Sequence, residues 1–271
     1  MNNFIYFGTP KVSGDTLALL LKNGFVPKLI VTAPDAPRGR GLVLTPSETK
    51  VLAREHGIPV ITPEKLTGET ITEIAGYRGD YALVVAYGKI FPEKLIAQFP
   101  KGVLNVHYSL LPKHRGATPL EAALLSGDAE TGVTIQKMVK ALDAGDVVAQ
   151  ASTPIAVNET ARELRPRLII LGAELLVKTL PAYLAGELSG IPQEAQLATH
   201  SGKLKKEDGL LDLTAAAEEN WRKYRAYADT IGTYFFKDGK RMKVTAASLK
   251  NGVFLVTRVI PEGKQEISYV I

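Results

Sequence analysis

The chain of 271 residues contains no cysteine. A disulfide scaffold, a thiolate nucleophile and a thiolate metal site are therefore excluded. This absence fits a reducing cytosol, although it does not identify a compartment. The sequence also lacks the G-x-G-x-x-G fingerprint of dinucleotide-binding proteins. Its histidines are too scattered for metal-ligand spacing, so we expect no metal site: His56, His107, His114 and His200.

A targeting segment and a long apolar run are also missing. The N-terminus enters the short apolar segment 4–7 without the basic region of a signal peptide. No stretch approaches the roughly 18 apolar residues that span a bilayer. We therefore expect a cytoplasmic protein with no membrane partner. The formal net charge of +5 permits a polyanionic partner without requiring one.

Short apolar runs alternate with helical-looking segments in the first half of the chain. Buried strands are expected at residues 4–7, 29–32, 81–85 and 103–107. Continuous apolar strands that alternate with helices predict an α/β fold with a mostly parallel, Rossmann-like sheet. Such sheets bind their ligands beyond the carboxyl ends of the strands.

The second half of the chain changes in character near residue 186. Before it we expect strands at 134–138 and 147–153 and a helix over 160–184, which Pro166 turns or kinks. After it come a helix over 214–227 and short strands with turns at Asp238-Gly239 and Asn251-Gly252. The predicted organisation is a catalytic domain (1–186), a linker (187–202) and a small C-terminal β domain (203–271).

The densest group of polar side chains spans residues 105–116. Asn105 and His107 are two apart in a predicted strand, so their side chains project to the same side. An amide donor beside an imidazole suits a reaction that builds negative charge on a carbonyl oxygen. The alternative is structural: His107 ends a strand and Asn105 belongs to a turn, and spacing alone does not separate the two.

Two further segments carry candidate residues. In the loop 141–146, Asp143 or Asp146 could orient His107 or accept a proton, but an aspartate-capped turn has the same pattern. In the segment 34–41, Arg38 and Arg40 alternate with glycines and could reach a phosphate backbone, although a solvated surface loop has the same pattern.

Two motifs resemble those of the folate-dependent formyltransferases: Asn-Val-His-x-Ser-Leu-Leu-Pro-x-x-Arg-Gly-Ala at 105–117 and Leu-Asp-x-Gly-Asp at 142–146. The resemblance covers nearly the whole chain and implies a catalytic trio of Asn105, His107 and Asp143. It also implies 10-formyltetrahydrofolate as the formyl donor, in a cleft lined by Ser109, Leu110, Leu111, Pro112, Tyr87 and Gly88. We expect the Asn105 amide and a protonated His107 to stabilise the oxyanion, with Asp143 holding His107 charged.

Members of this family differ in the amine that they formylate. The stretch with Arg38 and Arg40 resembles a loop found in the members that act on methionyl-tRNA, as do segments 206–212 and 258–264. The resemblance therefore implies contacts from Arg38 and Arg40 to initiator methionyl-tRNA. The implied product is N-formylmethionyl-tRNA for translation initiation. We expect the chain to act as a monomer.

The C-terminal part departs from that pattern. Segment 225–232 lacks the usual Pro-Trp-Pro, and the β tail is shortened, which predicts a truncated oligonucleotide-binding-type barrel with more exposed edge. Two alternatives stay open. One is an amino-sugar N-formyltransferase on the same fold, and the other is a tRNA-binding homologue that has lost catalysis.

Overall fold

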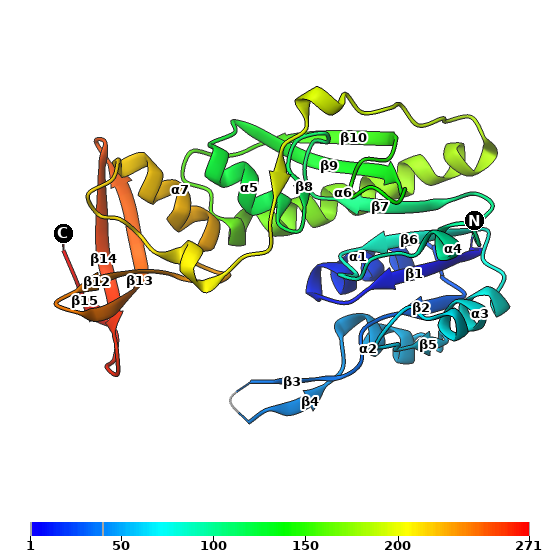
Figure 1. The fold of residues 1–271 in the computed structure, drawn as a ribbon, viewed down its shortest axis with the longest axis horizontal. Coiled ribbons are helices and arrows are strands. Elements are labelled where there is room, and N and C mark those ends of the chain that lie inside the picture. Colours follow the sequence, from blue (N-terminus) through cyan, green and yellow to red (C-terminus); the bar gives the residue numbers. More distant parts are fainter. Residues whose placement is uncertain (1, 40, 271) are drawn as a thin grey trace. The chain divides into compact units, whose positions relative to one another are not determined.

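A computed structural model describes residues 2–39 and 41–270 (Figure 1). Contacts divide the chain into two compact units. The first comprises Met1–Arg115, Gly132–Ser152 and Leu168–Thr199, and the second comprises Gly116–Thr131, Thr153–Arg167 and His200–Ile271. Two stretches of the predicted catalytic domain thus belong to the second unit, while the limits 1–186, 187–202 and 203–271 stay predictions.

The first unit is built around a seven-stranded sheet of order β10-β9-β7-β6-β1-β2-β5. Its strands are β1 (Phe4–Gly8), β2 (Leu29–Val31), β5 (Val60–Ile61), β6 (Tyr81–Val85), β7 (Val103–His107), β9 (Glu130–Lys137) and β10 (Val147–Pro154). The neighbouring pairs from β5 to β7 are parallel, whereas β7 and β9 are antiparallel. The predicted mostly parallel α/β sheet is confirmed.

Helices and short elements connect these strands. The helices are α1 (Lys11–Lys22), α2 (Glu48–Glu55), α3 (Gly68–Gly76), α4 (Glu93–Ile96), α5 (Pro119–Ser126), α6 (Ala161–Ala185) and α7 (Ala217–Tyr227). The 3-10 turns are η1 (Ala195–Leu197) and η2 (Lys206–Gly209), and β8 (Arg115–Gly116) pairs with β11 (His200–Ser201).

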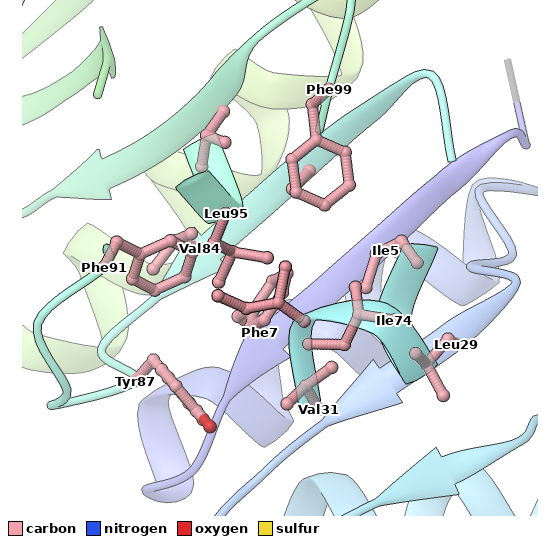
Figure 2. Packing of buried hydrophobic residues seen from close by; sticks show 13 residues of the cluster. Ile5, Phe7, Leu29, Val31, Ile74, Val84, Tyr87, Phe91, Leu95 and Phe99 are labelled. Atoms are coloured by element: carbon pink, nitrogen blue, oxygen red, sulfur yellow. The ribbon is translucent and has the colours of Figure 1, made fainter. Parts of the chain in front are cut away.

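An apolar cluster covers one face of the sheet (Figure 2). Ile5 and Phe7 are two apart in β1, so both point into this cluster, where they meet Ile74 of α3 and Leu95 of α4. The Phe7 ring lies 4.9 Å from that of Phe91 in an edge-on arrangement. Full burial of each such side chain contributes about 2 kcal/mol. This packing fixes β1, β6 and β7 as a rigid base for the loops at their carboxyl ends.

Helix α6 is more apolar than was expected from the sequence. An 18-residue window in it has a mean hydropathy of 1.7, so by length and composition it could cross a membrane, and the expectation that no stretch approaches such a run was wrong. Leu168 and Leu176 are fully buried. A Cβ at Gly172 would lie 3.3 Å from Val106 of β7 and Val133 of β9. These contacts are those of a core helix packed on the sheet.

The arginine-containing segment forms a β-hairpin rather than the irregular loop that was expected. Strand β3 (Ala36–Arg38) pairs antiparallel with β4 (Val43–Thr45). The backbone of Arg38 lies in β3, whereas Arg40 lies outside the described residues. Leu42 and Leu44 are 72% and 68% exposed, so these apolar side chains of the hairpin face solvent.

The second unit contains a four-stranded antiparallel sheet of order β12-β13-β14-β15. Its strands are β12 (Thr233–Lys237), β13 (Lys240–Lys250), β14 (Val253–Pro261) and β15 (Ile267–Ser268). The turns at Asp238-Gly239 and Asn251-Gly252 were predicted and have positive φ at both residues, as tight hairpins require. Phe235, Val244 and Val256 belong to the core of this open sheet.

Candidate active site

Strands β7 and β9 place four polar side chains on one face of the sheet. Asn105 lies opposite Gln136, and His107 lies opposite Thr134. Residues that face each other across a strand pair share one side of the sheet, and so do residues two apart in a strand. The antiparallel register therefore adds Gln136 and Thr134 to the predicted pair.

Asp143, from the loop after β9, completes the site. Its Oδ1 accepts hydrogen bonds from Gln136 Nε2 at 2.7 Å and from Asn105 Nδ2 at 3.5 Å. Its Oδ2 lies 3.7 Å from His107 Nδ1. The side chains of His107 and Asp143 are 5% and 12% exposed. The structure thus brings Asp143 to Asn105 and His107, although it lies 38 residues after Asn105 in the sequence.

The surroundings of His107 define which ring nitrogen carries its proton. Nε2 lies 3.0 Å from the backbone carbonyl of His114, which can only accept, so Nε2 donates and the neutral ring leaves Nδ1 free to face Asp143. Burial lowers the pKa of His107 below its ordinary value, and the Asp143 carboxylate acts in the opposite direction. Burial of the ring therefore favours the neutral imidazole, whereas a protonated His107 was expected.

The predicted folate segment directly follows β7 and is held by β9. Thr134 Oγ1 donates to the Ser109 carbonyl at 2.7 Å and accepts from the Leu111 amide at 3.1 Å. Ser109 and Leu111 are buried, whereas Leu110 and Pro112 are half-buried. The segment is therefore fixed in position, and Leu110 and Pro112 present its accessible side chains.

Tyr87 and Gly88 follow β6, the parallel neighbour of β7, and so lie at the same edge of the sheet. The Tyr87 ring packs edge-on against Phe7 and Phe91 at 5.5 and 5.9 Å. Its hydroxyl points away from Phe91 (Figure 2). Among the described residues this buried hydroxyl has no hydrogen-bond partner, and burial raises the pKa of Tyr87 to about 12. The side chain is therefore a neutral donor.

Two glutamines at the site were not predicted. Gln136 was part of an expected strand, but its contact with Asp143 depends on the β7–β9 register, which the sequence does not display. Gln193 fell in the predicted linker, yet its Nε2 donates to the carbonyls of Asp143 at 2.9 Å and Gly145 at 2.7 Å. Its Oε1 accepts from Arg115 Nε and Nη2 at 3.1 and 2.8 Å. Gln193 lies 50 residues from Asp143 in the sequence, and no local sequence pattern reveals a contact over that distance.

The structure says less about the two arginines and about metal binding. Arg38 is placed by its backbone alone, and Arg40 lies outside the described residues, so their contacts stay predictions. Within residues 2–39 and 41–270, no group of three or more His, Cys, Asp or Glu side chains could hold a metal ion.

Comparison with known proteins identifies the family. A family model described as "Formyl transferase" matches residues 3–180, and "Formyl transferase, C-terminal domain" matches residues 203–268. The chain is 41% identical over 241 residues to the methionyl-tRNA formyltransferase of Geobacter sulfurreducens, covering 89% of this chain and 76% of that protein. It is 39% identical to the methionyl-tRNA formyltransferase of Streptococcus pyogenes, covering 98% of this chain and 86% of that protein.

Solved structures share the fold. The N-formyltransferase of Helicobacter canadensis, in complex with folinic acid and dTDP-3-aminofucose, superposes with a TM-score of 0.73 over the full length of both chains. At 19% sequence identity, this likeness concerns the fold alone.

Proposed function

The chain belongs to the formyl transferase family, and we propose that it transfers the formyl group of 10-formyltetrahydrofolate to the α-amine of initiator methionyl-tRNA. The observation that carries the proposal is the convergence of Asn105, His107 and Asp143 on one buried face at the carboxyl end of β7. The acceptor is supported by relatives 39–41% identical that are methionyl-tRNA formyltransferases. The product is N-formylmethionyl-tRNA, which serves translation initiation.

The reaction requires a free amine and a stabilised oxyanion. An α-amine has a pKa of about 8, so much of it is protonated near neutral pH and must first lose a proton to solvent before it attacks. The amine nitrogen then bonds to the formyl carbon, and the carbonyl electron pair moves to the oxygen. The Asn105 amide donates to this oxyanion. One such donor is typically worth about 3 kcal/mol.

We propose that His107 starts the reaction neutral. Its Nδ1 faces Asp143, and because burial favours the neutral ring, this nitrogen is available to accept the proton that the attacking nitrogen must lose once it has bonded to the formyl carbon. The imidazolium that forms beside Asp143 then stabilises the oxyanion as the negative charge develops. When the carbon–nitrogen bond to folate breaks, the same proton passes to the departing nitrogen.

The folate is proposed to bind at the edge of the sheet formed by the ends of β6 and β7. The accessible Leu110 and Pro112 would contact it, and Ser109 and Leu111 would hold that segment in place. The unpaired Tyr87 hydroxyl, next to Gly88, supplies a donor for a polar group of the folate. No metal takes part in this proposal.

The tRNA is proposed to bind through the β3–β4 hairpin and residues 203–271. The exposed side chains on β4 support this, because a hairpin with open surfaces is available to a large partner. Arg38 and Arg40 would contact phosphate oxygens, which position a nucleic acid without reading its sequence. We expect this reaction to take place in the cytoplasm.

One experiment separates this function from its alternatives. The purified chain is offered 10-formyltetrahydrofolate together with methionyl-tRNA, charged on initiator or elongator tRNA, and with a nucleotide-linked amino sugar. We expect formylation of methionyl-tRNA and none of the sugar. Exclusive formylation of the sugar would establish an amino-sugar enzyme instead. Binding of tRNA without any transfer would indicate the non-catalytic homologue.

A further inference from the structure

Asp143 differs from its two partners in how it is placed. Asn105 and His107 lie in β7, whereas Asp143 lies in a loop and has a φ of 47°. This left-handed conformation is uncommon for a residue with a side chain, and it persists when surrounding contacts enforce it. We propose that Gln136 and Gln193 are positioning residues that hold Asp143, one through its carboxylate and the other through its backbone. The inference rests on the proposed role of Asp143 in formyl transfer.

Gln136 holds the carboxylate. The residue is 1% exposed, and its Nε2 donates to Asp143 Oδ1 at 2.7 Å. A carboxylate only accepts hydrogen bonds, so the amide nitrogen must be the end that faces it, and bonds to a charged group are the stronger ones.

Stability does not explain Gln136. Its Oε1 is buried and has no hydrogen-bond partner among the described residues. An unsatisfied buried oxygen lowers stability relative to an apolar side chain of similar shape. The benefit of an amide at this position is therefore its contact with Asp143.

Gln193 holds the backbone of the same loop. Its Nε2 binds the carbonyls of both Asp143 and Gly145, and Arg115 fixes its Oε1 with two donors. The loop is also pressed against β9, because a Cβ at Gly145 would lie 1.7 Å from the Lys137 carbonyl oxygen. Both carbonyls are thereby tied to Arg115 through one side chain.

Together these contacts determine which carboxylate oxygen serves the reaction. Oδ1 is engaged by Gln136 and lies within reach of Asn105, so rotation of the carboxylate would break these bonds. Oδ2 is consequently the oxygen directed at His107 Nδ1.

A double-mutant cycle tests the inference on the full chain. Gln136→Leu and Gln193→Leu should each lower kcat by up to about 100-fold, the cost of a displacement of a reacting group by about 1 Å, with the KM for tRNA and folate little changed. In an Asp143→Ala background each substitution should lower the residual single-turnover rate by less than about twofold, because residues that act as a unit are not additive.

Gln150→Leu is the matched control. Gln150 is an amide of the neighbouring strand β10, and its Nε2 donates to Thr134 and Leu111 rather than to Asp143. Its effect should be the same factor in both backgrounds. If Gln136→Leu and Gln193→Leu also lowered the rate equally in both backgrounds, their role would be structural and the inference would be overturned.

A second measurement uses no substrates. It tests the inference even if the leucine variants fold poorly or the proposed acceptor is wrong. In ¹⁵N-labelled protein, the side-chain amide signal of Gln136 is identified by its loss in Gln136→Glu. It should move in Asp143→Ala, while the Gln150 signal stays. An unmoved Gln136 signal would overturn the inference whatever the acceptor. Failure of the proposed function has a different signature, namely no formyl transfer by the parent enzyme.

Discussion

The proposed catalytic centre and the β3–β4 hairpin differ in how far their side chains are exposed. At the centre, His107 and Gln136 are 4% and 1% exposed, and polar side chains hold one another. On the hairpin, Leu42 and Val43 are 72% and 66% exposed. Proton transfer and oxyanion stabilisation need groups fixed to within a fraction of an ångström, whereas a site for a large polyanion needs accessible surface. The two regions should therefore fail in different ways when they are altered.

The hairpin is nevertheless fixed at its root. The hydroxyls of Thr32, Ser47 and Thr49 form a buried chain with contacts of 2.8 and 2.9 Å, and Thr49 donates to the Gly8 carbonyl at the end of β1. Lys50 pairs with Asp35 at 2.7 Å. The hairpin thus starts beside the carboxyl end of β1. The proposed catalytic residues lie at the same end of the parallel strands, at β7.

The largest effect is expected from the catalytic trio. Asn105→Ala or Asp143→Ala should lower kcat by about 10²- to 10³-fold, since each removes an oxyanion donor or a proton-handling group. The KM for tRNA should stay within a few-fold if the two regions work separately. Initial formylation rates at saturating tRNA measure this. A rate within a few-fold of the parent would mean that the trio is misassigned.

The pH titration of His107 tests whether the ring is neutral in the free protein. Burial lowers the pKa of the ring, so its NMR titration in the free protein should have a midpoint below about 6.5, the ordinary value. Asp143→Asn removes the charge that raises the pKa and should move the midpoint to still lower pH. The neutral form persists down to the midpoint and gives way to the imidazolium below it. A midpoint above the ordinary value would instead favour an imidazolium at rest.

A smaller effect is expected from the hairpin arginines. Arg38→Ala combined with Arg40→Ala should raise the KM for tRNA by about tenfold and flatten the salt dependence by about one slope unit for each phosphate that is no longer neutralised. The KM for 10-formyltetrahydrofolate and the kcat should stay unchanged. Lys94→Ala, which removes an exposed charge from α4, is the control. An unchanged salt slope in the double variant would remove these arginines from the tRNA site.

The smallest effect is expected at the root of the hairpin. Lys50 and Asp35 are 14% and 34% exposed, so their ion pair is partly screened and worth about 1 kcal/mol. Lys50→Met should raise the KM for tRNA by a few-fold and lower Tm by a few degrees, without changing kcat at saturation. A fall in kcat with an unchanged KM would show that the hairpin root supports the chemistry rather than tRNA binding.

The sequence predicted the fold best where one local signal dominates. The strands near 4–7 and 81–85 are continuous apolar runs, and the strand at 103–107 is apolar except for Asn105 and His107. All three were located to within a residue. The hairpin was missed as strands because Pro37 and the glycines around Arg40 are poor strand formers. The limits of helix α6 were predicted to within a residue, but its apolar character was underestimated.

The site shows the same division. Asn105 and His107 could be paired from their spacing within one strand, and Asp143 was found through its motif. Gln136 and Gln193 could not be found this way, because one depends on strand register and the other on a contact across 50 residues. The protonation of His107 also depends on burial, which no spacing reveals.

The most direct measurement is a single-turnover transfer of labelled formyl from 10-formyltetrahydrofolate to initiator methionyl-tRNA, run beside the same tRNA with its α-amine acetylated. We predict that the label appears on the methionine of the free-amine tRNA and is absent from the acetylated one. Absence of label from the free-amine tRNA at every enzyme concentration would contradict the account.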